Sequence, residues 1–503
     1  MRAVTAVQMR AIDAAAVARS GEIALMRAAG EAIAVLIERY ARGGCIVGIA
    51  GPGNNGGDAF AAVAAYGGTR ERIVYAAGTG AESPARVDAR ERARAAGVDV
   101  RTSPPDPSIL AHAGLVLDGV LGANARLPLD ARSRALVDAM NAGGAPVIAL
   151  DVATGSDPST GALDDVHVRA VATIALGAPK LGCFLEPARS ATGDMWCAPL
   201  GMRDEDAAGI DDDAFVLNAA EFTALLPRRA EESDKRSAGA PLLVAGSAQF
   251  PGAAVLCARA AARAGAGYVT VAAPEAAAAS LRAQLVEQVV VTYDERNPLD
   301  AVGDICDLAN HCGALAIGPG LALGDAMGQI VRGVVERIDL PIVADAGALF
   351  HLAKHLDMLL GKRIVITPHA GEFARLSGRG TVAPHDRLPR LRAFVAEHDV
   401  TTLLKGRATL IADGGAVHLN PTGTPALATA GTGDVLTGMI ATLLAQGLAP
   451  VDAARAGAYW HGLAGRIAGQ HRPVGVVAGD IPDRLAEAAR PAPQPCAELI
   501  RVF

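Results

Sequence analysis

Aromatic residues, paired cysteines and clusters of basic residues are scarce or missing in this sequence. Phe, Trp and Tyr together make up 3% of its 503 residues, so large rings cannot dominate the core. The seven cysteines are scattered, form no C-x-x-C pair and are odd in number, which argues against a disulfide framework or a zinc site. We therefore expect reduced, mostly buried thiols and a reducing compartment.

The distribution of charge excludes two classes of partner. The formal net charge is −7 and no run is rich in Lys or Arg, so we expect no electrostatic binding to nucleic acid or to anionic lipid. No stretch of about 18 apolar residues is free of charge, so no membrane span is predicted. Charged residues from Arg2 to Arg19 interrupt any apolar segment of a signal peptide. These features predict a cytoplasmic protein.

Apolar residues make up 51% of the chain, and short apolar runs alternate with Ala-rich helical patterns. This alternation is typical of an α/β protein with parallel sheets. A chain of this length exceeds the roughly 100–200 residues of one domain, so we expect two. Strands are predicted at 45–50, 72–77, 114–121, 146–151, 171–176, 241–246, 268–272, 287–292, 314–317, 341–344, 363–366 and 401–405.

The boundary is predicted near residue 210, between a domain at 1–210 and a domain at 211–503. Residues 202–222 read MRDEDAAGIDDDAFVLNAAEF, an acidic stretch without a strand signal, and we interpret it as a linker or as the entry to the second domain.

The most specific segment of the second half is ATAGTGDVLTGMIATLLAQG, residues 428–447. Apolar residues recur at helical spacing after Asp434, so the glycines lie in a turn that opens a helix. The free N–H groups of that first turn attract anions, and Gly431 and Gly433 allow close approach of a ligand. An anion site beside a carboxylate suits phosphoryl transfer to a hydroxyl, although an Asp-capped helix after a glycine turn is the simpler alternative.

Six segments of the second half resemble one family in both order and spacing, the ADP-dependent NAD(P)H-hydrate dehydratases of the ribokinase-like superfamily. The resemblance implies a ribokinase-like α/β fold. It also implies that ADP, or ATP in some members, phosphorylates the hydroxyl of a hydrated NADH or NADPH, after which phosphate leaves and AMP and NAD(P)H result. The segments are VAGSAQFPGAAVLCARAAARAGAGYVTVAAP (244–274), IGPG (317–320), IVADAGAL (342–349), VITPHAGEFARL (365–376), LLKGRATLIA (403–412) and ATAGTGD (428–434).

The same resemblance assigns site residues. Asp434 is the implied base, and Ala253, Gly320 and His369 are placed with it against the hydrate. Mg²⁺ is expected with the nucleotide phosphates, because it takes oxygen ligands. The adenine nucleotide is assigned to Lys405, Gly406, Arg407, Ala408, Thr409, Gly431 and Gly433.

The first half contains GPGNNGGDAF at residues 51–60, directly after an apolar strand. This is not a P-loop, because no Lys follows its glycines. Asn54, Asn55 and Asp58 add side-chain oxygens, which suit a hard cation. Asp118 and Thr154 lie just after two later strands, and the carboxyl ends of parallel strands meet at one edge of a sheet. We therefore expect Asn55, Asp118 and Thr154 to converge.

Residues 1 to about 205 resemble the NAD(P)H-hydrate epimerases, which bind K⁺ and interconvert the R and S hydrates. The resemblance implies a Rossmann-like sheet, K⁺ held by Asn55, Asp118 and Thr154, and Asp151 as the candidate for proton handling. Ala59 stands where the family has Gly, and we expect it to reshape the loop. The hydrate is assigned to Asn54, Asn55, Gly56, Gly57, Asp58, Gly122, Ala123, Asn124, Ala125, Arg126, Leu127, Pro128 and Asp151.

We therefore predict an enzyme of nicotinamide nucleotide repair with an epimerase half and an ADP-dependent dehydratase half, assembled as a homo-oligomer. One alternative is a ribokinase-like kinase of a small hydroxymethyl or sugar substrate. Another is a catalytically silent first domain that only binds a ligand or mediates assembly. A stable phosphorylated product would favour the kinase.

Overall fold

The computed structural model describes residues 1–78, 82–211, 214–470, 474–490 and 499–502. It forms two compact units, one of Met1–Asn218 with the end of the chain and one of Ala219–Pro491. The predicted second domain included the end of the chain. In the structure Ile500–Arg501 (β18) instead pairs antiparallel with Asp194–Ala198 (β7) of the first sheet.

The first sheet has the strand order β18-β7-β6-β5-β4-β1-β2-β3, and all its pairings except β18 with β7 are parallel. The predicted Rossmann-like parallel sheet is therefore confirmed. Its other strands are β1 (Cys45–Ala50), β2 (Arg72–Ala76), β3 (Asp99–Arg101), β4 (Ala113–Gly119), β5 (Val147–Leu150) and β6 (Ala172–Leu176).

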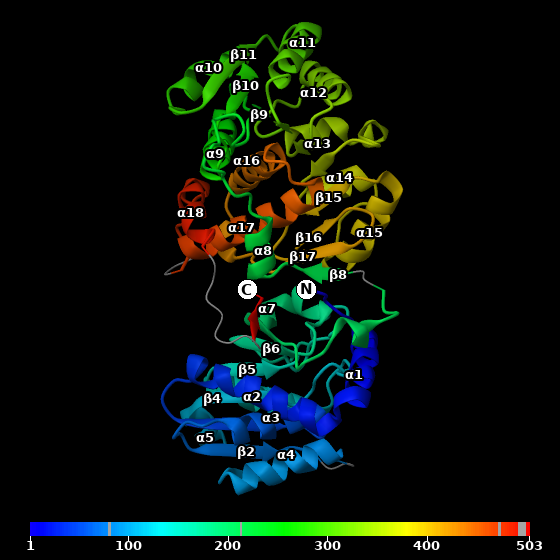
Figure 1. Ribbon diagram of the computed structural model, residues 1–503, viewed down its shortest axis with the longest axis vertical. Helices are drawn as coiled ribbons and strands as arrows, with labels where there is room; N and C mark the ends of the chain where they lie inside the picture. The colour runs from blue at the N-terminus through cyan, green and yellow to red at the C-terminus, as the bar shows by residue number, and fades with distance from the viewer. Residues whose placement is uncertain (79–81, 212–213, 471–473, 491–498, 503) are drawn as a thin grey trace. The chain divides into compact units, whose positions relative to one another are not determined.

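Helices cover both faces of this sheet (Figure 1). Alternate residues of β1 point to opposite sides: Ile46 packs with the core under α2, α3 and α4, whereas Val47 packs with the core under α5 and α6. Helices bury both faces of the sheet, so the strands carry apolar side chains on both faces. The helices of this unit are α1 (Ala6–Ser20), α2 (Glu22–Tyr40), α3 (Asn54–Ala65), α4 (Pro84–Ala95), α5 (Pro107–His112), α6 (Ala131–Gly143) and α7 (Arg189–Thr192), with 3₁₀ turns at Leu181–Phe184 and Asp204–Ala207.

The strand order reverses between β1 and β4, which are neighbours in the sheet but lead to opposite edges. In open α/β sheets a ligand binds in the crevice beyond the carboxyl ends of such a pair. The segment GPGNNGGDAF follows β1 and the loop with Asn124 follows β4. The fold therefore brings both predicted segments to one crevice.

Two sequence predictions about local structure are wrong. Most of the segment 51–60 forms the start of α3. Ala59 lies inside that helix and is fully buried, so the change from Gly to Ala at this position does not reshape a loop. Glycine is needed at Gly56, where a Cβ atom would stand 2.2 Å from the Gly51 carbonyl oxygen. The stretch 202–222, predicted to lack a strand, contains β8 (Ala214–Val216), whose three apolar residues are too few for a periodic signal.

Within the second unit the sheet has the order β11-β10-β9-β12-β13-β14-β15-β16-β17. Neighbours from β11 to β15 are parallel, and β15, β16 and β17 form antiparallel hairpins. The strand order reverses between β9 and β12, and in open α/β sheets ligands bind beyond the carboxyl ends of such a pair. The strands are β9 (Pro241–Val244), β10 (Thr270–Pro274), β11 (Val289–Tyr293), β12 (Ala314–Ile317), β13 (Ile342–Ala344), β14 (Ile364–Ile366), β15 (Thr401–Leu404), β16 (Thr409–Ala412) and β17 (Val417–Asn420).

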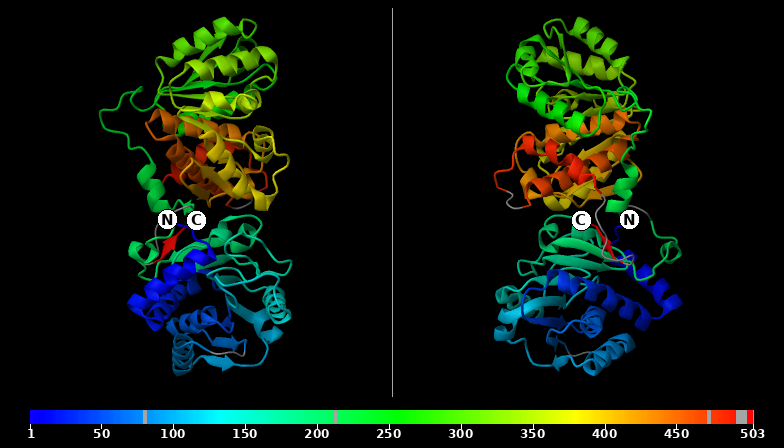
Figure 2. Two further views of the ribbon diagram at one scale, coloured as in Figure 1. Left: turned by 90° about the vertical axis from the view of Figure 1, so that its right-hand side faces the viewer. Right: turned by 60° about the vertical axis from the view of Figure 1, so that its left-hand side comes forward.

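Helix α16 (Thr432–Ala445) is the central helix of the second unit. It is apolar on nearly all sides because it packs against α9, α17 and strands β9, β12 and β13. Figure 2 shows α16 and α17 in orange, next to each other. The other helices are α8 (Ala219–Leu225), α9 (Pro251–Arg263), α10 (Glu275–Arg282), α11 (Pro298–Ala309), α12 (Asp325–Arg337), α13 (Gly347–Leu352), α14 (Ala370–Ser377), α15 (Arg387–His398), α17 (Pro450–Ala468) and α18 (Leu485–Ala488).

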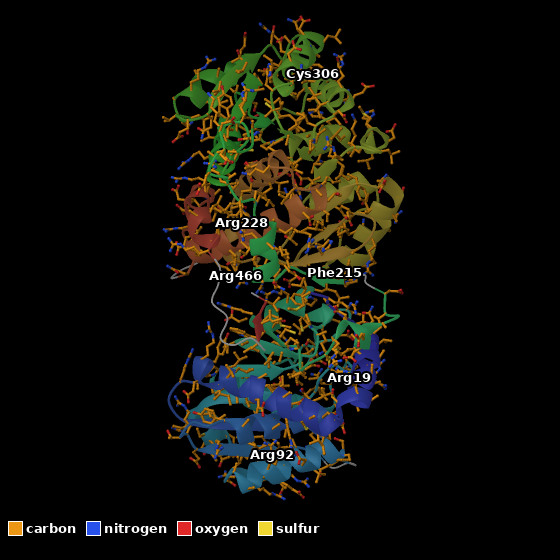
Figure 3. The ribbon with its side chains drawn as sticks, viewed as in Figure 1. Arg19, Arg92, Phe215, Arg228, Cys306 and Arg466 are labelled. Carbon is orange, nitrogen blue, oxygen red and sulfur yellow. The ribbon has the colours of Figure 1, made fainter. Side chains whose placement is uncertain are left out.

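Two of the exposed charged side chains are Arg92 on α4 and Arg19 at the end of α1 (Figure 3). Arg19 forms an ion pair with Asp206 at 2.7 Å. Six of the cysteines lie in the described ranges and all six are free thiols, as predicted; Cys496 lies outside those ranges. Among the helices that the structure describes, none is long and apolar enough to cross a membrane.

Candidate active sites

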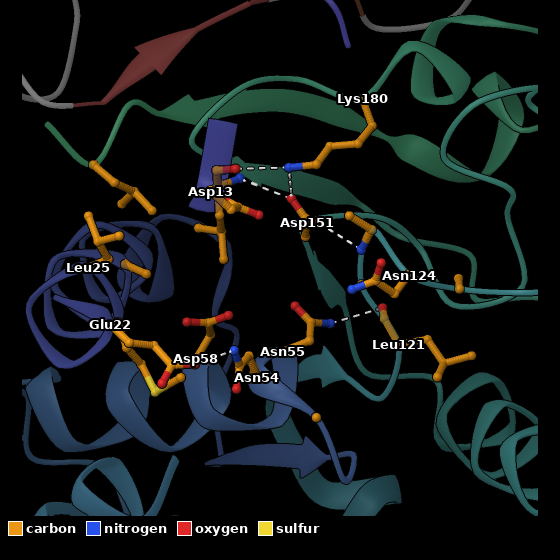
Figure 4. Close-up of a pocket in the computed structure, with 18 of the residues that line it drawn as sticks. Asp13, Glu22, Leu25, Asn54, Asn55, Asp58, Leu121, Asn124, Asp151 and Lys180 are labelled. Atoms are coloured by element: carbon orange, nitrogen blue, oxygen red, sulfur yellow. Dashed lines mark hydrogen bonds and ion pairs between the residues drawn. The ribbon is translucent and has the colours of Figure 1, made fainter. Parts of the chain in front are cut away.

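A cavity of about 380 Å³ opens in the first unit at the carboxyl ends of β1 and β4. Residues that follow both strands line it, and Figure 4 shows Asn54 and Asn55 facing Leu121 and Asn124 across it. Asn55 Nδ2 donates a hydrogen bond to the Leu121 carbonyl at 2.9 Å. The two loops of the crevice are therefore joined at its base.

Asp118 and Thr154 join the same network. The Leu121 N–H donates to Thr154 Oγ1 at 3.2 Å, and that hydroxyl donates to Asp118 Oδ1 at 2.7 Å. Burial raises the pKa of Asp118 to about 6, although the hydrogen bonds from Thr154 oppose the rise. The structure thus brings together the three side chains that the sequence predicted to converge.

Asn55 Oδ1 is buried and has no hydrogen-bond partner among the described residues. Buried acceptors are nearly always satisfied, so this oxygen fits a bound cation or water. The described residues contain no cluster of three or more His, Cys, Asp or Glu that could hold a metal ion. A donor set of one buried carboxylate with amide and hydroxyl oxygens fits a hard cation of low charge.

Asp151 follows β5 in a left-handed conformation, with φ of 69°. Such a conformation is uncommon for a residue other than glycine, and Asp tolerates it better than most. The side chain accepts hydrogen bonds from the Ala123 N–H at 2.9 Å and the Leu176 N–H at 3.2 Å. It also forms an ion pair with Lys180, whose side chain is 1% exposed. The carboxylate is therefore paired and fixed at the cavity wall.

In the second unit glycine turns follow β9 and β12. The Gly246 N–H donates to the Pro319 carbonyl at 2.7 Å, which joins the loops that follow the two strands. A Cβ atom on Gly320, whose φ is +67°, would stand 2.8 Å from the Ala253 Cβ. Ala253 and Gly320 therefore lie against each other, as their common assignment to the hydrate requires.

Asp434 lies in the first turn of α16, after a turn at Gly431 with φ of 94°. Burial raises its pKa to about 7, and the negative charge of Asp345 adds to the rise while Lys405 opposes it. A carboxyl group with this pKa changes its protonation state near neutral pH. It is suited to accept a proton during a reaction and release it afterwards.

A charged cluster surrounds this position. Lys405 Nζ lies 2.7 Å from Asp345 Oδ1 and 3.9 Å from Glu372 Oε2, and Thr437 Oγ1 donates to Asp345 Oδ2 at 2.9 Å. Burial alone lowers the pKa of Lys405, but the carboxylates around it raise the pKa above its usual value. A Cβ atom on Gly433 would lie 3.4 Å from Lys405 Nζ. The start of α16 therefore meets a fixed positive charge.

The two halves of the chain match two known families. Residues 241–487 match the NAD(P)H-hydrate dehydratase family, and residues 22–182 match the family described as YjeF-related protein N-terminus. A bifunctional NAD(P)H-hydrate repair enzyme of Pyrobaculum aerophilum is 32% identical in sequence. The alignment covers 97% of this chain and 98% of the relative. This chain belongs to the family of bifunctional NAD(P)H-hydrate repair enzymes.

Its first unit is thus an epimerase domain and its second a dehydratase domain. A second repair enzyme of this name, from Moorella thermoacetica, is 36% identical over 76% of this chain and 74% of its own. A solved ADP/ATP-dependent NAD(P)H-hydrate dehydratase from Bacillus subtilis, co-crystallised with ATP and Mg²⁺, is 32% identical. The match covers 55% of this chain and 97% of the solved chain, with a TM-score of 0.48.

In the dehydratase domain, residues 405–408 form the turn between β15 and β16. Thr409 Oγ1 donates a hydrogen bond to the Gly406 carbonyl at 2.8 Å and accepts one from the Gly406 N–H at 3.3 Å. The hydroxyl proton is therefore already engaged within the turn. Ala408 is buried. This segment therefore presents backbone groups, the Lys405 ammonium and the exposed residue Arg407 to a ligand.

His369 begins α14, and its Nδ1 accepts hydrogen bonds from the N–H groups of Gly371 at 3.0 Å and Glu372 at 3.2 Å. Because Nδ1 is an acceptor here, the neutral ring carries its proton on Nε2. The side chain is 61% exposed. Its Nε2 lies 3.6 Å from Glu372 Oε2, so His369 caps the helix while its exposed ring faces that carboxylate.

In the epimerase domain, not every predicted residue reaches the cavity. Asn54, Asn55, Asp58, Asp151 and the loop Gly122–Ala125 line it. Gly56, Gly57 and the segment 126–128 lie outside that lining, and a Cβ on Gly57 would meet the Met26 side chain at 2.5 Å. The two glycines therefore serve close packing of α3.

Sequence reasoning missed several charged residues of the sites. Lys180 and Asp13 line the epimerase cavity, and Asp345 anchors Lys405 in the dehydratase domain. Lys180 follows β6 and Asp345 follows β13, so a search for charged residues just after each strand would have found both. Asp13 lies on a helix far from any glycine turn, and only the tertiary structure brings it to the cavity.

Proposed function

We propose that Asp434 is the base of the dehydratase reaction. Its position carries the proposal, because it lies in the first turn of α16 with a pKa of about 7, beside Lys405 and the N–H groups that open the helix. The ring hydroxyl of the S hydrate attacks the terminal phosphorus of ADP, the bond to the leaving AMP oxygen breaks, and Asp434 takes the hydroxyl proton. Loss of phosphate and of a ring proton then restores NAD(P)H.

Lys405 and the start of α16 stabilise the transferred phosphoryl group. The helix N-terminus supplies N–H donors, and Lys405 supplies a positive charge that Asp345 holds in place. Mg²⁺ would be carried by the nucleotide phosphates, because it keeps water and phosphate oxygens as ligands. The exposed His369 ring would contact the hydrate, together with the surface formed by Ala253 and Gly320.

In the epimerase domain, Asp118, Thr154 and Asn55 Oδ1 would hold K⁺, which would fix the loops of the crevice and polarise an oxygen of the hydrate. Asp151 accepts a hydrogen bond from the reacting hydroxyl and orients the ring, because Lys180 holds the carboxylate in one place. Asn54 and the backbone of Gly122–Ala125 contact the rest of the hydrate. The R and S forms would then interconvert in this cavity.

The dehydratase assignment is tested with pure S hydrate, ADP and Mg²⁺ while nicotinamide absorbance is followed. We expect recovery of NAD(P)H by the wild-type chain, a loss of at least about 100-fold with Asp434→Asn, and no change with Asp304→Asn, which removes an exposed carboxylate from α11. Full activity of Asp434→Asn would refute the role of Asp434. A phosphorylated product that accumulates would identify a kinase instead.

The epimerase assignment is tested by adding a mixture of R and S hydrates under the same conditions. We expect complete conversion in two phases, a fast phase for S and a slower one for R. If the R hydrate disappears no faster with the protein than without it, the first domain has no epimerase activity. We also propose a cytoplasmic location, which the six free thiols support, and a homo-oligomer, which sedimentation velocity would test.

A further inference from the structure

Asp13, on α1, is a carboxylic acid in the epimerase cavity that has no role in the reaction described so far. It follows Met9 by four residues and precedes Ala16 by three, so it lies on the buried side of the helix. It lines the cavity and, in Figure 4, points into it from the side where Lys180 and Asp151 lie. An acid on the apolar side of a helix is costly unless the site uses it.

Asp58, on α3, lies on the opposite side of the cavity in Figure 4. Its side chain is nine-tenths buried, with 9% exposed. Neither carboxyl group, of Asp13 or of Asp58, has a hydrogen bond or ion pair to any residue that the structure describes. Two carboxyl groups thus face the same space with their hydrogen-bonding capacity unused.

The surroundings of the cavity raise the pKa of both groups. Burial raises the pKa of Asp13 to about 6; Lys180 opposes this rise and Asp151 adds to it. Burial also raises the pKa of Asp58 well above its usual range, and the charges of Asp151, Asp13 and Glu22 act in the same direction, against Lys180. Each of the two groups can therefore exist as an acid near neutral pH.

Epimerisation needs a group that can exchange a proton on each face of the hydrated ring. Inversion of the hydroxyl-bearing carbon by loss and return of water requires proton transfer on one face of the ring as water leaves and on the other face as water adds. Asp151 is poorly placed to exchange protons, because Lys180 and two backbone N–H groups already bind its oxygens.

Given the epimerase function proposed above, we propose that Asp13 is a catalytic residue that exchanges a proton with the departing or entering water on one face of the hydrated ring, opposite Asp58. As the C–O bond breaks on the Asp58 side, its electron pair leaves with the oxygen, Asp58 gives that oxygen a proton, and the ring nitrogen supplies electrons to the ring carbon. Water then adds from the Asp13 side, and Asp13 takes its extra proton. Asp13 acts as the acid when the reaction runs in reverse.

The test uses the full-length protein with pure R hydrate and no ADP, so that the dehydratase is idle. The approach to the R/S equilibrium is followed by chromatography. We expect Asp13→Asn to slow it at least about 100-fold, Asp13→Glu to retain part of the rate, and Asp138→Asn, an exposed carboxylate on α6, to match the wild type. The dissociation constant for the hydrate, measured by calorimetry, should change less than about threefold.

The pH profile distinguishes catalysis from support of the fold. The epimerisation rate of the wild type should change with pH around 6, where Asp13 changes its protonation state, and this change should vanish in Asp13→Asn. An Asp13→Asn rate within about threefold of wild type would overturn the proposal, and so would a loss of hydrate affinity as large as the loss of rate. If Asp13→Asn fails to fold, a wild-type rate in Asp13→Glu at every pH would also overturn it. No catalysed epimerisation by the wild-type chain would instead refute the epimerase function.

Discussion

The rate of S-hydrate dehydration should rise about tenfold from pH 6 to pH 8, because Asp434 must be ionised to accept the hydroxyl proton. With a pKa of about 7, roughly 9% of the Asp434 carboxyl groups are ionised at pH 6 and roughly 90% at pH 8. An aspartate at the usual pKa of 3.8 would be ionised throughout, and the profile would be flat over this range. The slope therefore reports the burial of this side chain.

Asp345→Asn sharpens this prediction. The substitution removes a negative charge that raises the pKa of Asp434, and it frees Lys405, whose charge lowers that pKa. Both effects shift the profile toward lower pH, so the ratio of rates at pH 8 and pH 6 should fall well below ten. The amide introduced by this substitution still offers an oxygen to Thr437 Oγ1, which limits local rearrangement.

The assay is the initial rate of NAD(P)H recovery at saturating ADP and Mg²⁺, corrected for the rate without protein, from pH 5.5 to pH 8.5. Asp304→Asn serves as the control and should keep the wild-type profile. A flat wild-type profile between pH 6 and pH 8 would refute the argument. A profile that moves to higher pH in Asp345→Asn would contradict the signs assigned to Asp345 and Lys405.

Three further predictions concern the structures around the sites. Lys180→Met should destabilise the epimerase domain by about 3–5 kcal/mol in urea unfolding, because it leaves the buried Asp151 charge unpaired; an unchanged midpoint would disprove the pairing. Gly320→Ala should weaken hydrate binding, because a Cβ would stand 2.6 Å from the Phe250 carbonyl oxygen, whereas Gly303→Ala, with nothing within 4 Å, should leave the KM for the S hydrate unchanged. Replacing K⁺ by tetramethylammonium should slow epimerisation and spare dehydration, and Asn55→Leu should abolish that K⁺ response; equal rates in both salts would refute the cation site.

Much of the site could be predicted because ligands gather at strand ends. Asp118, Asp151 and Thr154 each lie at or just after the end of a buried strand, and a parallel sheet carries such residues to one edge whatever its exact strand order. Asp434 was predicted for a similar reason, since its glycine turn opens a helix with a clear apolar period. These are local patterns that the chain shows within about ten residues.

The amino-acid sequence by itself determined the α/β class, most of the strands and the residue types at the glycine turns, because period, composition and turn chemistry act between near neighbours. The tertiary structure alone decided that the epimerase cavity lies at β1/β4, that Lys180 binds Asp151, and that Asp13 reaches this cavity. It also placed Ala59 inside a helix and raised the pKa of Asp434. Burial and long-range charge depend on distances between segments far apart in the chain, which no local pattern specifies.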